Sequence, residues 1–436
     1  MRKTSIIILT YNNLSLTKKC IESIFKYTEK DTYEIIVVDN ASTDDTVSYL
    51  KEQKNIKTVF NSENVGFPRG CNIGIQLASK DNDILLLNND TIVTTNWLKN
   101  LKICLESDEK IGAVGAISNN NDNLQGCDFS YNNFDEMQIL AEKNNVSDPK
   151  KWERKVCLIG FCLLIKRAVL EKLGGLDENY SPGYIEDNDL SLRIIDLGYD
   201  LVLCHDAFIH HYLGTAFRKD QEKFNQLILK NRAYFEQKWK FDVFTFDKTK
   251  YLSTFLASNA QHILDYNCEI GASSLHIKYS FEKANVIGIE KNEEKAKIAC
   301  KYIPVVSSLD KLKNQKFDTI FIGNALETED NPLWFLYDLQ KILTENGKII
   351  GEVKNLSFID NLKLLIDETW YYTNFQKQNY FTKKDLLKLF ESLGFKKQTI
   401  HSYKRELIEE EKELLNRLNK PDLEADTYYY AFCFVK

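Results

Sequence analysis

The sequence predicts an α/β protein with two domains, each organised around a mainly parallel sheet. The first observation is a series of short apolar runs at residues 6–9, 35–38 and 84–87, which alternate with helical patterns. The second is a separate alternation of strand and helix signals, which begins near residue 262 and ends in the apolar run 428–435. The third is the length of 436 residues, which exceeds what one hydrophobic core usually organises.

The domain bounds follow from where these alternations stop. Residues 221–240 have a helical pattern that closes the first domain, which we place at 1–240. We expect a linker at 241–254 and a second, different domain at 255–436. The polar, asparagine-rich stretch 118–155 lies inside the first domain, and we expect it to be a loop-rich insertion near the ligand-binding face.

Composition excludes several classes of protein. The net charge of −6, with both signs scattered along the chain, argues against nucleic acid as a principal partner. No apolar run approaches the ~20 residues that span a bilayer, and the N-terminus enters a strand without a signal-peptide core. The ten cysteines are dispersed without a CxxC pair, which indicates reduced thiols rather than a zinc site or a disulfide framework. We therefore expect a cytoplasmic protein without a transmembrane segment.

Polar residues follow three predicted strands of the first domain, at the ends where parallel sheets bind ligands. They are Thr10, Tyr11 and Asn12, then Asp39, then Asn89 and Asp90. Asp90 suits a divalent cation that bridges two phosphates, and Asp39 suits a hydrogen bond from a nucleobase. Both residues also suit turns or helix caps, and the residues alone leave these alternatives open.

Three later segments carry further candidates. Arg69 lies in a glycine-containing stretch, and an arginine can pair with phosphate where glycines let the backbone approach closely. Glu186 and Asp187 begin a helix, where one carboxylate can act as a general base, although acids also favour a helix N-terminus for dipole reasons. His210 and His211 are adjacent after a strand, and histidines near Asp90 suit metal ligation as well as a structural role.

The order of these segments resembles the family 2 glycosyltransferases of the GT-A fold over about residues 1–240. The matching stretches are 6–12, 35–44, 64–74, 85–91 with Trp97, 174–178, 186–193 and 211–217. The resemblance implies a nucleotide-diphosphate sugar donor, with a UDP-sugar favoured, and inversion at the anomeric carbon. The acceptor would be a glycan, a lipid-linked molecule or a protein, in surface polysaccharide synthesis or in glycosylation of a protein such as flagellin.

The resemblance also implies roles for individual residues. It places Thr10, Tyr11, Asn12, Asp39, Arg69, Asn72 and Asn89 at the donor. Asp90, in an Asn-Asn-Asp element that stands where the family has Asp-x-Asp, and His211 would hold Mn²⁺ or Mg²⁺. Leu213 adds a residue before the family's Gly-Ser/Thr step, which keeps His210 as an alternative ligand. Asp187, beside Glu186, would be the base that deprotonates the acceptor in a single displacement.

Residues 255–436 resemble class I S-adenosylmethionine-dependent methyltransferases, including the family's final antiparallel strand, here the apolar run 428–435. A strand ends on Asp265 before a turn with Gly271, and the next strand ends on Glu290, about 20 residues later. These three residues would be the remnant of the cofactor site. Asn267 and Glu269 replace the first two glycines of the family's loop, and this departure counts against S-adenosylmethionine as a cofactor and favours a structural or acceptor-docking role.

Two alternatives remain open from the sequence. A bifunctional enzyme would also methylate the glycan, and an assembly protein would have lost both activities. The retained Asp90, Glu186, Asp187 and His211 conflict with the second alternative. A homo-oligomer and peripheral attachment at the inner face of the membrane are both compatible with the sequence, since an acceptor could be lipid-linked.

Overall fold

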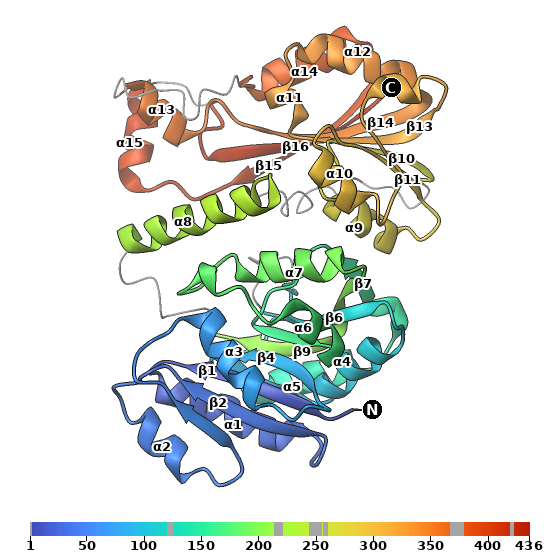
Figure 1. The fold of residues 1–436 in the computed structure, drawn as a ribbon. Coiled ribbons are helices and arrows are strands. Elements are labelled where there is room, and N and C mark those ends of the chain that lie inside the picture. Colours follow the sequence, from blue (N-terminus) through green and yellow to red (C-terminus); the bar gives the residue numbers. More distant parts are fainter. Residues whose placement is uncertain are drawn as a thin grey trace. The chain divides into compact units, whose positions relative to one another are not determined.

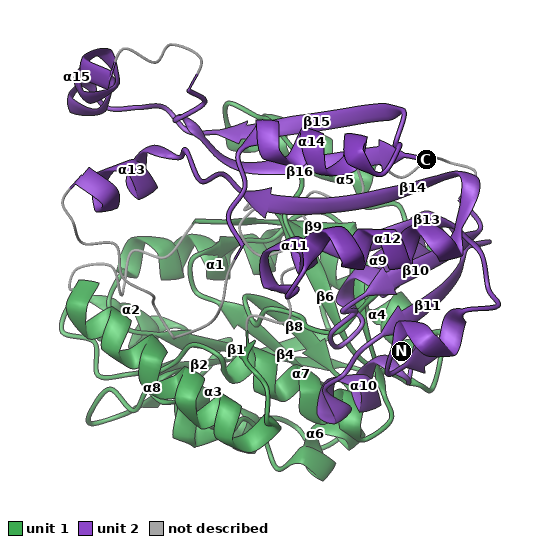
Figure 2. Ribbon diagram, turned by 90° about the horizontal axis from the view of Figure 1, so that it is seen from above, with its two compact units in different colours: residues 1–246 green, residues 247–436 purple. Residues whose placement is uncertain are grey.

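The computed structural model describes residues 2–119, 125–212, 221–243, 255, 260–366, 379–418 and 423–436. The chain forms two compact units, Met1–Phe246 and Asp247–Lys436, which Figure 2 draws in different colours. Each unit has its own sheet and hydrophobic core, so the predicted α/β class is confirmed. Residues 244–254, most of the expected linker, lie outside the described residues.

The sheet of the first unit is mixed (Figure 1). Its order is β3-β2-β1-β4-β8-β6-β9-β5, and β7 pairs with β9. β1 is parallel to β2 and β4, whereas β8 runs antiparallel between β4 and β6. The strands are β1 (Thr4–Thr10), β2 (Tyr33–Asp39), β3 (Lys57–Phe60), β4 (Asp83–Asn88), β5 (Thr91–Ile92), β6 (Ile111–Ser118), β7 (Trp152–Lys155), β8 (Cys162–Ile165) and β9 (Asp200–His211).

The central strands of this sheet are buried on both faces, which explains their continuous apolar runs. Residues 6–8 of β1 are at most 1% exposed. In the register of the sheet, Thr10 pairs with Asp39 and Leu9 pairs with Asn88. The polar residues that follow β1, β2 and β4 therefore meet at one edge of the sheet, where ligands of parallel sheets bind.

The helices of the first unit follow the predicted alternation, with one correction. They are α1 (Leu14–Tyr27), α2 (Thr46–Glu52), α3 (Phe67–Leu77), α4 (Trp97–Glu106), α5 (Phe134–Asn144), α6 (Arg167–Leu173), α7 (Glu186–Asp196) and α8 (Gln221–Trp239). The stretch 118–155 is not simply loop-rich, because it contains α5 and β7. The side chain of Asn133 caps α5, and only Met137 and Ala141 of the helix are buried, so its apolar pattern is weak.

The second unit is a sheet in the order β12-β11-β10-β13-β14-β16-β15. Its strands are parallel except β16, which runs antiparallel to both neighbours, as the resemblance to class I methyltransferases predicted. The strands are β10 (His262–Tyr266), β11 (Asn285–Ile289), β12 (Val305–Val306), β13 (Phe317–Gly323), β14 (Leu343–Lys354), β15 (Lys397–Lys404) and β16 (Thr427–Val435).

The helices of the second unit lie between and after these strands. They are α9 (Ala272–Ser280), α10 (Glu293–Ala299), α11 (Ala325–Thr328), α12 (Pro332–Ile342), α13 (Ile359–Ile366), α14 (Lys383–Ser392) and α15 (Glu409–Leu418). Both Figure 1 and Figure 2 show α13 and α15 side by side at one end of the unit. In the described part of the chain, no helix is long and apolar enough to cross a membrane.

Candidate active site

Asp39, the last residue of β2, has a buried carboxylate with one oxygen that lacks a hydrogen-bond partner within the described part of the chain. Asp39 is 1% exposed, and its Oδ2 accepts a hydrogen bond of 3.0 Å from the backbone N–H of Ser42. Its Oδ1 is buried and has no hydrogen-bond partner among the described residues. Asp39 therefore caps the turn before α2, which begins only at Thr46, and still offers one oxygen to a donor group.

The other residues at this edge hold one another in place. The amide of Asn89 donates to the hydroxyls of Thr10, at 3.1 Å, and Thr17, at 3.0 Å. The side-chain oxygen of Asn12 accepts from the backbone N–H of Thr43 at 2.7 Å. Thr10, Asn12 and Asn89 are therefore used in shaping the loops of this edge. Tyr11, by contrast, is 44% exposed and presents its ring at the surface.

Asp90 and His211 come together at the end of the sheet. Thr91 of β5 pairs with His211 of β9, which brings His211 Nε2 to 3.2 Å from Asp90 Oδ1. The ring of Phe161 stacks on the imidazole with a centroid distance of 5.1 Å and an interplanar angle of 12°. Residues 213–217, which complete the motif that starts at His211, lie outside the described residues.

His210 points away from this pair, because successive residues of a strand alternate between its faces. Its Nδ1 lies 2.6 Å from the hydroxyl of Tyr131, and the rings of Phe134 and Tyr212 contact it edge-on. Burial, followed by the charge of His211, lowers the pKa of His210 to about 4. Of the two histidines, the structure brings His211 to Asp90 and pairs His210 with a tyrosine.

Asp90 and His211 form a pair of donors rather than a complete metal cage. Among the described residues, no group of three or more histidine, cysteine, aspartate or glutamate side chains converges on one point. A carboxylate and an imidazole both suit divalent cations such as Mn²⁺. The remaining ligands of a cation here would come from a diphosphate or from water.

Two consecutive carboxyl groups begin α7: Glu186 is buried, and Asp187 is partly buried with a buried Oδ1. The preceding residues, Tyr184 and Ile185, have φ angles of 71° and 74°, a backbone region that costs energy for side chains of this kind. Glu186 Oε2 and Asp187 Oδ1 are buried and have no hydrogen-bond partner among the described residues. Such groups are uncommon in folded proteins and point to a functional role.

Burial controls the protonation of this pair. Burial raises the pKa of Asp187 from 3.8 to about 6, and the backbone of Gly160 lowers it in part. Burial and then the charge of Asp187 raise the pKa of Glu186 well above its usual range. The pKa of the neighbouring Cys157 thiol is raised to about 12, mainly by burial, so this neighbour is neutral. The pair therefore contains a carboxyl that titrates close to neutral pH.

The other carboxylates of this segment are already paired. The ammonium group of Lys238 lies 2.7 Å from both Asp177 and Asp189. Asp189 also accepts hydrogen bonds from Arg193 at 2.8 Å and from the indole of Trp239 at 3.0 Å. Lys238 and Trp239 belong to α8, so this helix neutralises the carboxylates that flank the unpaired Glu186 and Asp187.

Two further predicted donor residues, Arg69 and Asn72, lie on α3. The Asn72 amide donates to the carbonyl of Leu176 and to Glu178, both at 2.9 Å, and accepts from the Leu176 N–H at 2.9 Å. Asn72 thus fixes the loop at 175–178, and its amide is fully used there. Arg69 is exposed and lies 3.9 Å from Glu178, which leaves its guanidinium accessible.

Sequence reasoning missed three positioning residues. Gly160 contacts Asp187 so closely that a Cβ at this position would lie 2.5 Å from the carboxylate oxygen. The next residue, Phe161, stacks on His211. Consecutive residues therefore contact the Glu186–Asp187 pair and the Asp90–His211 pair. Asn231 of α8 is fully buried and donates to the carbonyls of Tyr180, Gly183 and Tyr184. No sequence motif marked these residues, because their roles depend on contacts between distant segments.

In the second unit, the predicted cofactor residues lie at the ends of β10 and β11. Asp265 is 4% exposed and accepts a hydrogen bond of 2.6 Å from Ser274. Gly271 has a φ angle of 90° and precedes α9, as expected of a turn glycine. The two oxygens of Glu290 accept from the backbone N–H groups of Glu269, at 3.0 Å, and Asn292, at 2.8 Å.

The loop between β10 and α9 differs from a glycine loop in its contacts as well as its sequence. Asn267 and Glu269 have φ angles of 53° and 55°, the left-handed region that glycine adopts at least cost. The side chain of Glu269 forms an ion pair with Lys295. The backbone N–H of Glu269 is therefore hydrogen-bonded to Glu290, and the carboxylate of Glu269 is paired with Lys295.

Comparisons with known proteins agree with this arrangement. Residues 5–174 match the model of glycosyl transferase family 2, and residues 234–400 match that of a methyltransferase domain. The O-antigen chain rhamnosyltransferase RfbN of Salmonella typhimurium is 26% identical over 225 residues, which are 51% of this chain and 70% of that protein.

Two solved structures are similar to parts of this chain. The mannosyltransferase PcManGT from Pyrobaculum calidifontis, in complex with GDP-Man and Mn²⁺, is 20% identical with a TM-score of 0.41, over 54% of this chain and 64% of that chain. A SAM-dependent methyltransferase from Archaeoglobus fulgidus is 20% identical with a TM-score of 0.34, over 47% of this chain and 99% of that chain.

Proposed function

We propose that the first unit transfers a sugar with inversion, because residues 5–174 match glycosyl transferase family 2, ahead of residues 234–400, which match a methyltransferase domain. The donor is a nucleotide-diphosphate sugar, with a UDP-sugar favoured, and the acceptor is a hydroxyl group of a surface polysaccharide or a protein. The observation that carries the proposal is the Glu186–Asp187 pair, in which each carboxyl group has one buried oxygen without a partner among the described residues, and which Gly160 and Phe161 connect to His211.

Asp187 is the proposed general base. With a pKa raised to about 6, it is ionised at pH 7 and still basic enough to accept a proton from a hydroxyl group that is attacking the donor. Asp189, two residues later, is unsuited to this role because Arg193 and Lys238 neutralise it. Burial and the charge of Asp187 raise the pKa of Glu186 well above its usual range, which favours the neutral form of Glu186 beside an ionised Asp187.

Asp90 and His211 are the proposed ligands of a divalent cation. Their side chains are 3.2 Å apart, and His211 Nδ1 is buried without a partner among the described residues, so neither group is committed to the surrounding protein. A bound cation would neutralise negative charge on the diphosphate that leaves the sugar. Phe161 keeps the imidazole in one orientation, and Asp39 offers its free Oδ1 to an N–H of the nucleobase.

A donor panel tests this function. The full chain would be mixed with UDP-, GDP- and dTDP-sugars, with Mn²⁺ or Mg²⁺, and scored for hydrolysis and for thermal stabilisation. We expect one nucleotide class to respond only with metal, and Asp187→Asn to abolish transfer while donor binding persists. A panel without any response, or near-normal transfer by Asp187→Asn, would refute the proposal.

The residues of the second unit support methyl transfer less well than the residues of the first unit support glycosyl transfer. The ribose of S-adenosylmethionine would need the carboxylate of Glu290, whose two oxygens already accept backbone hydrogen bonds. Asn267 and Glu269 also stand where the family has glycines, which would let the backbone approach the cofactor more closely. We therefore propose a structural or acceptor-docking role. Calorimetry with S-adenosylmethionine distinguishes the alternatives, because micromolar binding would favour a bifunctional enzyme that also methylates the glycan.

A further inference from the structure

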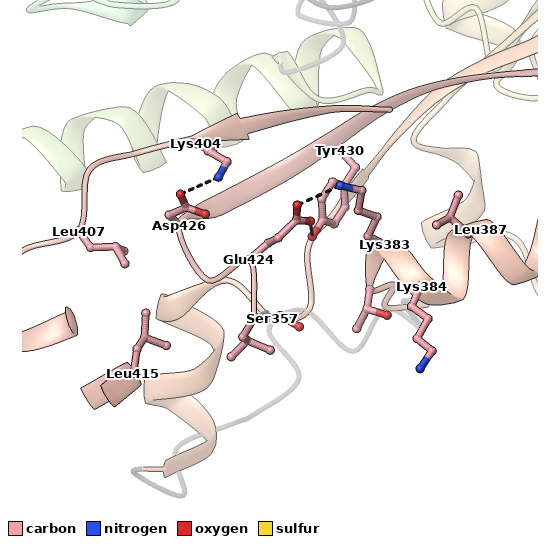
Figure 3. Close-up of a pocket in the computed structure, with 12 residues that line it drawn as sticks. Ser357, Lys383, Lys384, Leu387, Lys404, Leu407, Leu415, Glu424, Asp426 and Tyr430 are labelled. Carbon is pink, nitrogen blue, oxygen red and sulfur yellow. Dashed lines mark hydrogen bonds and ion pairs between the residues drawn. The ribbon is translucent and has the colours of Figure 1, made fainter. Parts of the chain in front are cut away.

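A cavity of about 790 Å³ lies in the second unit, away from its altered cofactor loop. It opens where β14 ends and β16 begins, with lining residues from α14, from the end of β15 and from α15 (Figure 3). β14 runs parallel to β13, so the cavity adjoins the carboxyl end of a parallel strand, where α/β sheets bind ligands. Its lining combines lysines and leucines.

The charges of the lining leave one cation unneutralised. Lys383 lies 2.9 Å from Glu424, and Lys404 lies 2.9 Å from Asp426. Glu424 also accepts a hydrogen bond of 2.8 Å from the hydroxyl of Tyr430. Both carboxylates of the lining are therefore occupied. Lys384 has no carboxylate partner among the described residues, and Figure 3 shows its ammonium group apart from both carboxylates.

Lys384 carries its positive charge at a position where one is unfavourable. It lies in the first turn of α14, whose N-terminus carries the positive end of the helix dipole. Asp385 of the same turn accepts hydrogen bonds from Thr382, and Glu424 and Asp426 are paired with Lys383 and Lys404. An anionic group in the cavity would be attracted by the ammonium group of Lys384.

The remaining lining is aliphatic. Leu387, Leu407 and Leu415 face the cavity from α14, from the segment before α15 and from α15 itself. Ile408, which follows Leu407 in the chain, is 57% exposed. An ion pair between Lys363 and Glu411 holds α13 against α15. Aliphatic side chains therefore continue from the cavity to the surface of this end of the unit, which suits a hydrocarbon chain.

We propose that this cavity binds a phosphate-bearing amphiphile, with the phosphate at Lys384 and the aliphatic chain along the leucines. The size of the cavity accommodates a phosphate head group and the first part of a chain. We identify this molecule as the lipid-linked acceptor of glycosyl transfer, and this identification rests on the function proposed for the first unit. The second unit then serves to capture the acceptor rather than to methylate it.

Calorimetry on the full chain tests the site with octyl phosphate, inorganic phosphate and octanol. We expect octyl phosphate to bind at least ten times more tightly than either of the other two probes. Lys384→Glu should weaken octyl phosphate binding at least tenfold, whereas Lys388→Glu, on the same helix but outside the cavity, should leave it unchanged. Leu415→Ser should weaken binding of octyl phosphate and not that of inorganic phosphate.

Several results would overturn the proposal. Equal affinity for octyl phosphate in Lys384→Glu and the unaltered chain would exclude the site. Equal affinity for octyl phosphate and inorganic phosphate would show a simple anion site without a place for the chain. Hydrolysis of the nucleotide sugar without acceptor should be the same in Lys384→Glu. If the chain binds octyl phosphate but responds to no nucleotide sugar, the result would support this site and refute the function proposed for the first unit.

Discussion

Replacing Asp187 by asparagine should stabilise the protein while removing its proposed base. The folded chain holds the proton of Asp187 more tightly than the unfolded chain does, because burial raises its pKa from 3.8 to about 6. The ionised carboxylate therefore costs folding free energy, and this cost is absent at low pH and complete above pH 6. From these pKa values, the cost is about 1 kcal/mol at pH 4.5 and about 3 kcal/mol at pH 7.5.

Guanidinium unfolding of the full chain at both pH values measures this difference. We expect Asp187→Asn to raise the free energy of unfolding by about 3 kcal/mol at pH 7.5 and by only about 1 kcal/mol at pH 4.5. Asp189→Asn is the matched control on the same helix. It removes a buried partner of Arg193 and Lys238, so it should lower stability by about 3–5 kcal/mol. A neutral or destabilising Asp187→Asn at pH 7.5, or a gain that does not shrink in acid, would refute the reasoning.

Three further predictions concern the same site. Turnover should rise with pH up to an apparent pKa of about 6 and then level off, since Asp187 must be ionised, and initial rates between pH 5 and 8 at saturating donor measure this. His211→Asn should abolish the stabilisation that Mn²⁺ adds to nucleotide binding in thermal melts, whereas His210→Asn should retain it; equal loss in both would contradict the assignment. Asn231→Ala removes the amide that donates to the carbonyl groups of Tyr180, Gly183 and Tyr184, so it should cost about 2–3 kcal/mol in chemical unfolding and lower turnover more than donor affinity.

The architecture of both units and the sheet edge of the proposed site could be predicted from the order of residues alone. A continuous apolar run of four or five residues has few alternatives to a strand buried on both faces, and the ends of parallel strands share one edge. Asp39 and Asp90 could therefore be proposed from local pattern alone. The antiparallel β16 was likewise predicted, in this case from the resemblance to a family.

Contacts between distant segments select which of several similar side chains are left without a charged partner. Asp187 and Asp189 are two residues apart on one helix, yet Asp189 meets Lys238 and Trp239 of α8, whereas Asp187 lies against Gly160. The alternation of β9 required His210 and His211 to face opposite sides, but the pairing of β5 with β9 selected His211 for Asp90. Ionisation and reactivity depend on burial and on partners from distant segments, and a linear pattern of residues contains neither.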